Sequence, residues 1–231
     1  MAQAPVKVQP IVDLQSLGLN QNSFRFGFLT LESEKYICIR DEAQDGSAQV
    51  VVVELQNNNN VIRRPMKAEA AIMNPTQNII ALKAKNESSG GHFVQVYNLD
   101  AKQKIKVHDF PEPIVYWRWL SHSKLALVTV RSVYHWSMEG SDVPKKMFDR
   151  SGPLEGANAQ IIGYATDASE AWLLLTAIST PDRGKTILGH IQLYFSTTGQ
   201  QQILEGYAGC FGEIPLHDGQ PPVTCFSFVE K

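Results

Sequence analysis

The sequence is short of cysteine and of long apolar runs, and each shortage excludes a class of protein. Only three of its 231 residues are cysteines, Cys38, Cys210 and Cys225, and no two form a C-x-x-C pair. Neither a disulfide framework nor a zinc site is therefore indicated, and we expect buried, reduced thiols. No apolar run approaches the length of a membrane span, and the first residues show no secretory signal.

Charge is also sparse. Charged residues make up 19% of the chain, below the usual quarter, and the formal net charge is −2. This balance excludes an overall basic footprint for nucleic acid, so no nucleic-acid partner is expected. Apolar residues make up 43%, which excludes a disordered chain and is enough for a sizeable core.

Catalytic and ligand-binding motifs are missing as well. The chain has no nucleophile elbow, no phosphate-binding loop and no glycine-rich dinucleotide fingerprint. Its six histidines are scattered without metal-ligand spacing. His135 lies between Tyr134 and Trp136, and we expect it to be a satisfied core or half-exposed side chain. We predict no enzyme, cofactor or metal site, although an enzyme with a central pocket built from distant residues stays open as an alternative.

What the chain does have is an internal repeat. Apolar hairpins recur five times, with turns 42 to 51 residues apart. The hairpins are at 27–39, 70–82, 115–128, 160–175 and 211–226. A third strand follows the first four hairpins, and a fourth, more polar strand follows that. The third strands are 50–53, 94–97, 133–136 and 191–194, and the fourth are 61–66, 104–107, 145–148 and 202–204.

Four strands in each repeat of this length are typical of the blades of a β-propeller. Inner strands read as continuous apolar runs, as expected where both faces are covered, and outer strands are more polar. A β-sandwich would explain the strands but not their fixed period. We find no convincing helical periodicity beyond a short turn. The fold prediction is therefore all-β, with about four and a half four-stranded, WD40-like blades.

The ends of the repeat are incomplete. The segment 11–14 is predicted to be an outer strand lent to the last blade, and the fifth repeat stops after its second strand. A ring that does not close exposes sheet edges, which proteins normally avoid. We expect residues 1–231 to form one partial propeller domain that belongs to a longer propeller.

Several long strings identify a family. The chain resembles the N-terminal domain of clathrin heavy chains in strings that run from its first residues to its last. These strings are 32–40, 62–65, 71–75, 80–84, 133–140, 147–150 and 160–162. The resemblance implies a seven-bladed propeller, a linker and a long helical leg. The later blades, the leg, the light-chain-binding segment and the trimerisation region are not in this sequence.

The resemblance also implies a function. The family's propeller captures short linear motifs of endocytic adaptors, the best known being acidic and leucine-containing, in a groove between the first two blades. The apolar floor of that groove matches Val52, Ile62, Met66, Ile80 and Tyr97, and its polar rim matches Arg64, Gln95, Lys102 and Lys104. Val52, Met66 and Tyr97 depart in size from the Ile or Phe typical of the family, and Phe93 stands where a small polar residue is typical.

Physical chemistry favours the same groove. An extended peptide docks through main-chain bonds and alternate side chains, and acidic residues are attracted by nearby hydrated cations. Lys102, Lys104 and Lys106 alternate, so on a strand they are expected to share one face. Taken alone, this pattern also fits a solvated edge strand guarded by lysines. On periodicity alone Val52, Ile62 and Ile80 would be plain core.

Two further peptide sites are implied by the resemblance. Phe26, Gln160 and Ile162 match a site that reads tryptophan-bearing motifs, although core packing of Phe26 is the alternative. Trp172, Leu193 and Gln202 match a groove between the fourth and fifth blades. The family's basic residue there is replaced by Thr198, which argues against acidic peptides in that groove.

The function predicted from the sequence is that of a non-enzymatic, adaptor-binding propeller of a clathrin coat in vesicle-mediated transport. Its location would be cytoplasmic, on coated pits and vesicles. Light chains and other heavy chains would bind only regions outside this sequence, and membrane would be reached only through adaptors. The alternative is a generic propeller scaffold that binds a folded partner.

Overall fold

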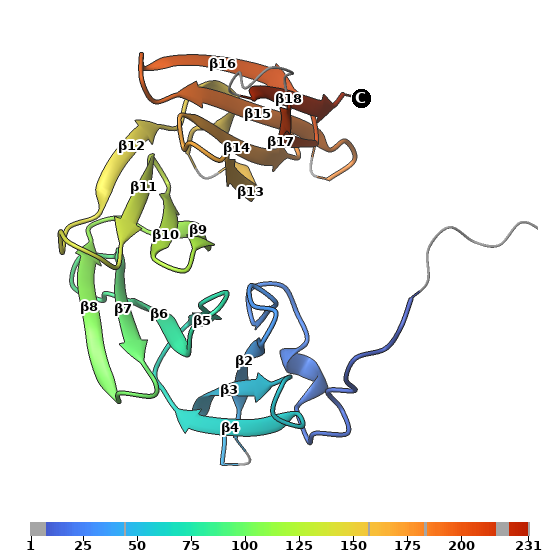
Figure 1. Ribbon diagram of the computed structural model, residues 1–231, viewed down its shortest axis with the longest axis vertical. Helices are drawn as coiled ribbons and strands as arrows, with labels where there is room; N and C mark the ends of the chain where they lie inside the picture. The colour runs from blue at the N-terminus through green and yellow to red at the C-terminus, as the bar shows by residue number, and fades with distance from the viewer. Residues whose placement is uncertain (1–7, 44, 157, 183, 216–221, 231) are drawn as a thin grey trace, which may run out of the picture. The chain divides into compact units, whose positions relative to one another are not determined.

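The fold is built from strands. The computed structural model describes residues 8–43, 45–156, 158–182, 184–215 and 222–230, and Figure 1 shows its elements. The helical elements among these residues are two short 3₁₀ turns, η1 (Gln21–Ser23) and η2 (Gly152–Leu154). The all-β prediction is confirmed.

The strands form four four-stranded sheets and one hairpin, each in simple chain order. The first sheet contains β1 (Leu29–Thr30), β2 (Tyr36–Glu42), β3 (Ala48–Glu54) and β4 (Asn60–Pro65), and the second contains β5 (Ala70–Met73), β6 (Ile79–Lys85), β7 (His92–Asn98) and β8 (Gln103–Phe110). The third contains β9 (Ile114–Ser121), β10 (Lys124–Thr129), β11 (Ser132–Ser137) and β12 (Lys145–Asp149). The fourth contains β13 (Ala159–Thr166), β14 (Trp172–Ser179), β15 (Leu188–Phe195) and β16 (Gln200–Glu205).

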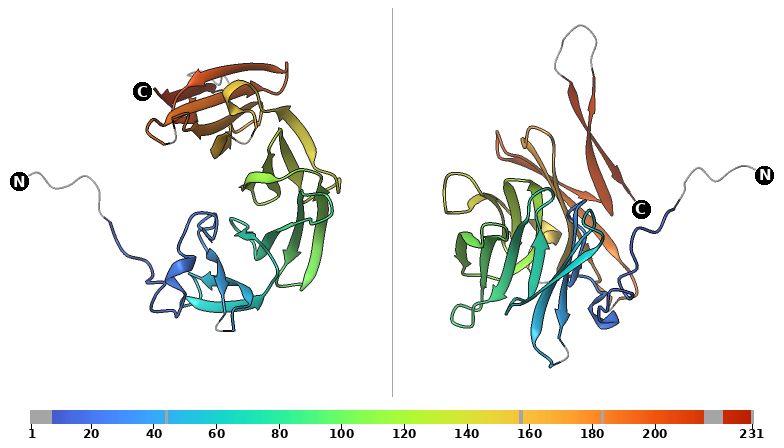
Figure 2. Two further views of the ribbon diagram at one scale, coloured as in Figure 1. Left: turned by 180° about the vertical axis from the view of Figure 1, so that it is seen from behind. Right: turned by 60° about the horizontal axis from the view of Figure 1, so that its bottom comes forward.

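The hairpin is β17 (Ala208–Ile214) paired with β18 (Val223–Val229), which lie side by side in Figure 2. Every strand expected inside the five repeats is therefore present, as four blades and half of a fifth. The turn expected at Asp218 lies outside the described residues.

Local sequence explains where strands turn. The connection from β3 to β4 uses the asparagine tract, in which Asn58 and Asn59 have φ of 50° and 56°. Asparagine tolerates this left-handed region better than most residues, so the tract makes a tight turn. The Glu54 carboxylate accepts hydrogen bonds from Asn57 and Asn60 at 2.9 and 2.8 Å and holds the turn.

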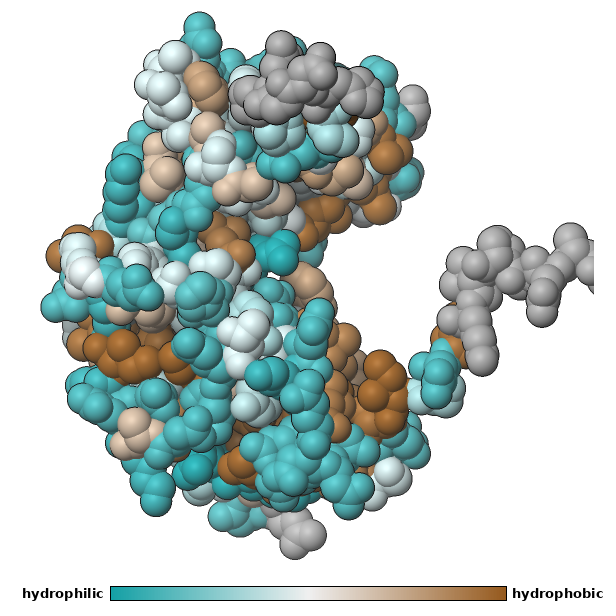
Figure 3. Space-filling view, in the orientation of Figure 1, coloured by the Kyte–Doolittle hydropathy of each residue, from teal (hydrophilic) through white to brown (hydrophobic). Residues whose placement is uncertain are grey.

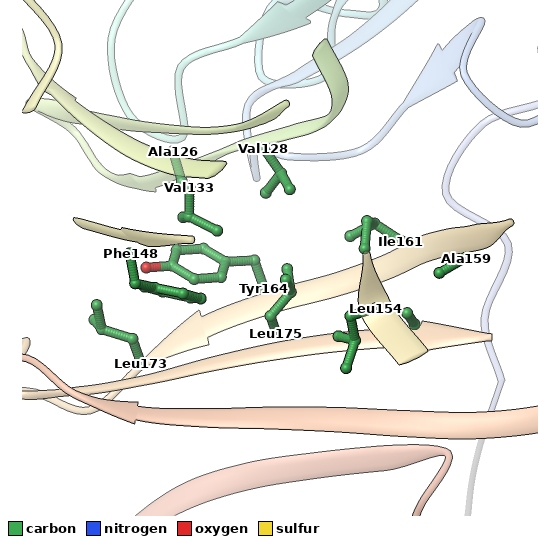
Figure 4. Packing of buried hydrophobic residues seen from close by; sticks show 11 residues of the cluster. Ala126, Val128, Val133, Phe148, Leu154, Ala159, Ile161, Tyr164, Leu173 and Leu175 are labelled. Atoms are coloured by element: carbon green, nitrogen blue, oxygen red, sulfur yellow. The ribbon is translucent and has the colours of Figure 1, made fainter. Parts of the chain in front are cut away.

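Residue contacts divide the chain into two compact units. The first consists of Met1–Ala84 and Val94–Ile105, and the second of Lys85–Phe93 and Lys106–Lys231. The second unit has a continuous core of apolar side chains from the third and fourth sheets, with Val128, Leu173 and Leu175 fully buried. Figure 4 shows Phe148 and Tyr164 among these side chains.

A hydrogen-bonded cluster borders this core. The Tyr164 hydroxyl lies 2.7 Å from His135 Nε2, and Lys124 Nζ lies 2.6 Å from a Glu170 carboxylate oxygen. Burial raises the pKa of the Tyr164 hydroxyl. His135 is 6% exposed, as the sequence led us to expect of a satisfied core histidine.

The described residues of the first unit include apolar clusters of their own. One is formed by Ile37, Ile39, Val51 and Val53 on β2 and β3. Val12 and Leu14 pack against it, but the segment 11–14 is not a strand. The prediction of an outer strand there is wrong, because its apolar side chains are used in packing and no strand among the described residues pairs with it.

The structure also corrects two other expectations. Lys106 is buried beside Asp142, at 3.3 Å, and donates to the carbonyls of Gly140 and Ser141, so it does not share a solvated face with the other lysines.

The second expectation concerns the cysteines. Cys38 is buried, and burial raises the pKa of its thiol to about 12. Cys225 is half-buried and Cys210 is exposed, so the expectation of buried thiols is wrong for both.

Hydrophilic side chains cover most of the face seen in Figure 3, and apolar side chains gather in separate patches. No helix among the described residues is long and apolar enough to cross a membrane.

Candidate peptide-binding site

The predicted floor of the first groove lies entirely within the first unit. Val52 on β3 is opposite Ile62 on β4, so their side chains share one face of the first sheet. Val52 and Ile80 are 3% and 1% exposed and belong to one apolar cluster, against which Met66 and Tyr97 pack. The surface a ligand could touch is therefore made by the half-buried Ile62, Met66 and Tyr97, with Val52 and Ile80 as support beneath.

The predicted rim is polar and accessible. Arg64 is opposite Val50, on the same face as Ile62, and is exposed. Lys104 is exposed on β8. Lys102 is also exposed, but it lies in the turn before β8 with φ of 51°. The two lysines therefore do not alternate along one regular strand, because the chain turns at the first of them.

Gln95 and Tyr97 act as a pair. They are two residues apart on β7, so their side chains project to the same side. The Tyr97 hydroxyl donates a hydrogen bond of 2.9 Å to Gln95 Oε1. This bond uses the Gln95 oxygen as an acceptor, and the two N–H donors of the same amide suit carbonyl or carboxylate groups of a ligand.

Sequence reasoning missed Tyr36 and Leu99, which pack against the same apolar cluster. Tyr36 alternates with Cys38 on β2, and this alternation is the signal that could have found it. Burial raises the pKa of the Tyr36 hydroxyl, and the Asp100 and Glu54 carboxylates add to the rise.

The second predicted site is divided between the two units. Phe26 belongs to the first unit and is 81% exposed, so the alternative that it is a core residue is wrong. Gln160 and Ile162 belong to the second unit on β13. The pairing of β13 with β14 shifts between Ile161 and Gly163, which makes Ile162 the extra residue of a β-bulge. The joint site stays a prediction.

The third predicted groove is a concave surface within the second unit. Leu193 and Gln202 are cross-strand partners on β15 and β16. With Trp172 they line a depression of about 410 Å³ that also includes Gln200 and Gln201. A smaller one of about 110 Å³ adjoins Trp172 and Leu193 and is lined by Phe211, Thr224, Cys225 and Phe226.

The described residues that line the third groove include no charged side chain. Thr198 lies in the turn between its strands, and its hydroxyl donates to Gln200 Oε1 at 3.2 Å. The side chains present are apolar or offer amide and hydroxyl groups. The groove therefore suits an uncharged segment and does not offer a cation to an acidic one.

Metal chemistry has no support among the described residues, since no three His, Cys, Asp or Glu side chains among them gather as a metal site would require. Among the histidines that the structure describes, His135 has the most strongly shifted pKa. Burial lowers its pKa to about 4 against the opposing influence of Glu170. The side chain of His135 is buried.

The sequence of the chain is similar to the sequences of several known proteins. No family model matches the chain. The chain is 43% identical over 228 residues to the clathrin heavy chain of Drosophila melanogaster, which covers 98% of this chain. It is 42% identical over 227 residues to clathrin heavy chain 2 of Homo sapiens and 39% identical over 231 residues to that of Dictyostelium discoideum.

The chain is a clathrin heavy chain homologue. The homology extends over nearly all of its residues, but the chain spans only 13% of the length of these relatives.

The propeller fold of this clathrin homologue has independent support. The β-propeller domain of the trilobed protease of Pyrococcus furiosus superposes with a TM-score of 0.51 at 14% identity, over 82% of this chain and 60% of that one. At this identity the similarity concerns the fold alone. The prediction of a β-propeller is confirmed.

Proposed function

We propose that this chain is the adaptor-binding propeller of a clathrin heavy chain and that it captures short acidic, leucine-containing peptides in its first groove. The proposal is supported by the half-buried apolar side chains of Ile62, Met66 and Tyr97 and by the exposed cations Arg64, Lys102 and Lys104, which the resemblance assigns to the rim of the same groove. Leucine side chains would bury against the first set, and acidic side chains would be attracted by the second.

The exposed lysines of the rim can attract an acidic peptide while they remain hydrated. Because Lys102 and Lys104 are exposed, their attraction for an acidic peptide is screened by salt and favours rapid capture. A short disordered peptide also loses conformational entropy on docking, so each motif should bind with micromolar or weaker affinity. Many copies in a lattice would supply the necessary strength.

The wider role we propose follows from the homology. The chain would contribute to the clathrin coat of pits and vesicles on the cytoplasmic side of membranes, in endocytosis and intracellular protein transport. Adaptors would link it to membrane, and it would have no catalytic activity. The site of Phe26, Gln160 and Ile162 and the groove of Trp172, Leu193 and Gln202 would accept further motifs, the latter uncharged ones.

The test is a charge reversal measured by fluorescence anisotropy with a labelled acidic leucine-motif peptide. The double variant Lys102→Glu, Lys104→Glu should weaken binding about ten-fold and flatten the dependence of affinity on salt. The matched control is Lys145→Glu, Lys185→Glu, which reverses two exposed lysines of the second unit.

Equal losses in the two double variants would show that only net charge matters and would refute the groove. A peptide that binds neither variant nor the unaltered chain would favour a scaffold for folded partners.

A further inference from the structure

One turn of the second unit holds a residue in a backbone conformation that its type does not favour. Glu170, between β13 and β14, has φ of 58°, which lies in the left-handed region. Glycine adopts this region freely and asparagine tolerates it, whereas a glutamate is strained there. Such a residue persists where its surroundings hold it, and strain of this kind gathers at functional sites.

The Glu170 side chain accounts for a glutamate at this position. One carboxylate oxygen lies 2.6 Å from Lys124 Nζ, at the start of β10, and the other lies 3.8 Å from His135 Nδ1 on β11. The Lys124 and Glu170 side chains are 28% and 34% exposed, so salt screens this ion pair less than a fully exposed one. A glycine in place of Glu170 would relieve the strain but would supply no partner for Lys124.

Hydrogen bonds connect this turn to Trp172. The Glu170 N–H donates to the Asp167 carbonyl at 3.1 Å, and the Trp172 N–H donates to the Asp167 carboxylate at 2.8 Å. From the other side, the Ser196 N–H donates to the Ala171 carbonyl at 2.8 Å, and its hydroxyl donates to the Glu170 carbonyl at 3.3 Å. Each of these three consecutive residues is held by a hydrogen bond, so a displacement of Glu170 would be passed on to Trp172.

Trp172 is shared by both depressions of the third groove, as is Leu193. Its ring packs on Phe195, with the two ring centroids 4.4 Å apart. An indole ring offers a large apolar surface, so its orientation decides the shape of the surface that a ligand meets. The position of Glu170 therefore bears on the third groove, although the described lining of the two depressions does not include Glu170.

We propose that Lys124 and Glu170 are positioning residues for the third groove. Their ion pair holds the turn between β13 and β14 in its left-handed conformation and thereby sets the orientation of the Trp172 ring. Both act through Trp172, because a site keeps its shape only when neighbouring groups lock its side chains. The inference rests on the proposed function only for the ligand, since the orientation of Trp172 can be measured without one.

The first measurement is fluorine NMR of the whole chain labelled with 5-fluorotryptophan. The chain has four tryptophans, and Trp172→Ala identifies the resonance of Trp172. Lys124→Met should move or broaden this resonance, because the turn loses its charged partner, and Lys124→Arg should restore it. The matched control is Lys185→Met, which removes an exposed lysine of the same unit and should leave the resonance in place.

Glu170→Gly separates a positioning role from a merely structural one. Glycine adopts the left-handed conformation without strain, so this variant should lower the midpoint of thermal unfolding by less than Lys124→Met does. It should nevertheless move the Trp172 resonance, because the tie to Lys124 is gone. If both variants lower the midpoint and leave the Trp172 resonance in place, the ion pair only stabilises the fold and the proposal is refuted.

The second measurement is anisotropy with a labelled, uncharged pentapeptide in which leucine alternates with asparagine. Its leucines suit the apolar lining of the third groove, and its amides suit the glutamines there. Lys124→Met and Glu170→Gly should each weaken binding about three-fold, whereas Lys124→Arg and Lys185→Met should stay within about two-fold of the unaltered chain.

The two measurements fail separately. If the pentapeptide binds Trp172→Ala as well as the unaltered chain, the third groove of the proposed function is wrong, and the fluorine resonance alone decides whether the ion pair positions Trp172. If the Trp172 resonance stays in place in Lys124→Met, or moves equally in Lys185→Met, the positioning role is refuted whatever the peptide does.

Discussion

At the scale of single residues, the hydroxyl of Tyr97 has the clearest consequence for the proposed groove. The resemblance led us to expect Ile or Phe at several positions of the floor, whereas Tyr97 carries a hydroxyl group. The Tyr97 hydroxyl donates to Gln95 Oε1 at 2.9 Å, which leaves the N–H groups of the Gln95 amide as its donors for a ligand. A groove that prefers acidic peptides gains from this orientation, because carboxylates accept hydrogen bonds.

We predict that Tyr97→Phe weakens binding of the acidic leucine peptide two- to five-fold, because the freed Gln95 side chain must be ordered again on binding. A peptide with asparagine in place of aspartate should lose less affinity. Anisotropy titrations measure both. Tyr134→Phe removes a hydroxyl from the third sheet as a control, and an equal loss there would contradict the assigned role of Tyr97.

Other residue-level expectations failed for identifiable reasons. Lys106 shares its alternation with Lys104, but alternation along one strand does not reveal Asp142, a partner 36 positions further on. Phe26 is one of several closely spaced aromatics, which suggested a core, yet Gly27 turns the chain there and leaves the ring exposed. Tertiary contacts and a single positive φ decided these cases, and neither is visible in a local pattern.

At the scale of elements, strands were predictable because their apolar runs are bounded by turn residues. The predicted strand 70–73 matches β5, Ala70–Met73, without adjustment. The segment 11–14 was not predictable in this way. Its apolar residues satisfied the pattern of a strand, but a strand also requires a partner edge, and Val12 and Leu14 instead pack against the β2–β3 cluster.

A histidine in its neutral form links strands β11 and β13 of the second unit by a hydrogen bond. His135 on β11 contacts the Tyr164 hydroxyl on β13 at 2.7 Å, and burial lowers its pKa to about 4. In the unfolded chain the same imidazole has a pKa near 6.5 and binds a proton more readily. The contribution of His135 to the free energy of unfolding should therefore be fully present above about pH 6.5 and should decrease as the pH falls from there toward 4.

We predict that the free energy of unfolding is about 2 kcal/mol lower at pH 5 than at pH 7 through this residue alone. Chemical denaturation of the unaltered chain and of His135→Gln at both pH values measures the difference between them. His135→Gln should not show the part of the decrease between pH 7 and pH 5 that protonation of His135 causes. An identical pH dependence in the two proteins would show that His135 is protonated as easily when folded as when unfolded.

At the scale of the whole molecule, the four-strand period predicted the repeating sheets and the propeller, and homology to clathrin heavy chains supports the same architecture. The candidate grooves were less accessible to prediction from pattern alone. On periodicity alone Val52, Ile62 and Ile80 read as plain core. Val52 and Ile80 are core, but Ile62 is half-buried. The pattern did not reveal the accessible surface that Ile62, Met66 and Tyr97 provide. The resemblance to the family pointed to these residues. The hydrophobic pattern could not, because residues that bind a ligand do not recur at a fixed spacing in a sequence.

The central claim is that an acidic leucine peptide occupies the first groove. Hydrogen–deuterium exchange of the chain with and without saturating peptide tests it most directly, because docking along strand edges slows exchange of the amides it covers. We predict protection in fragments covering 60–66 and 95–104, with none in fragments covering 188–205. Protection confined to the latter, or absent from the former while the peptide is bound, would contradict the account.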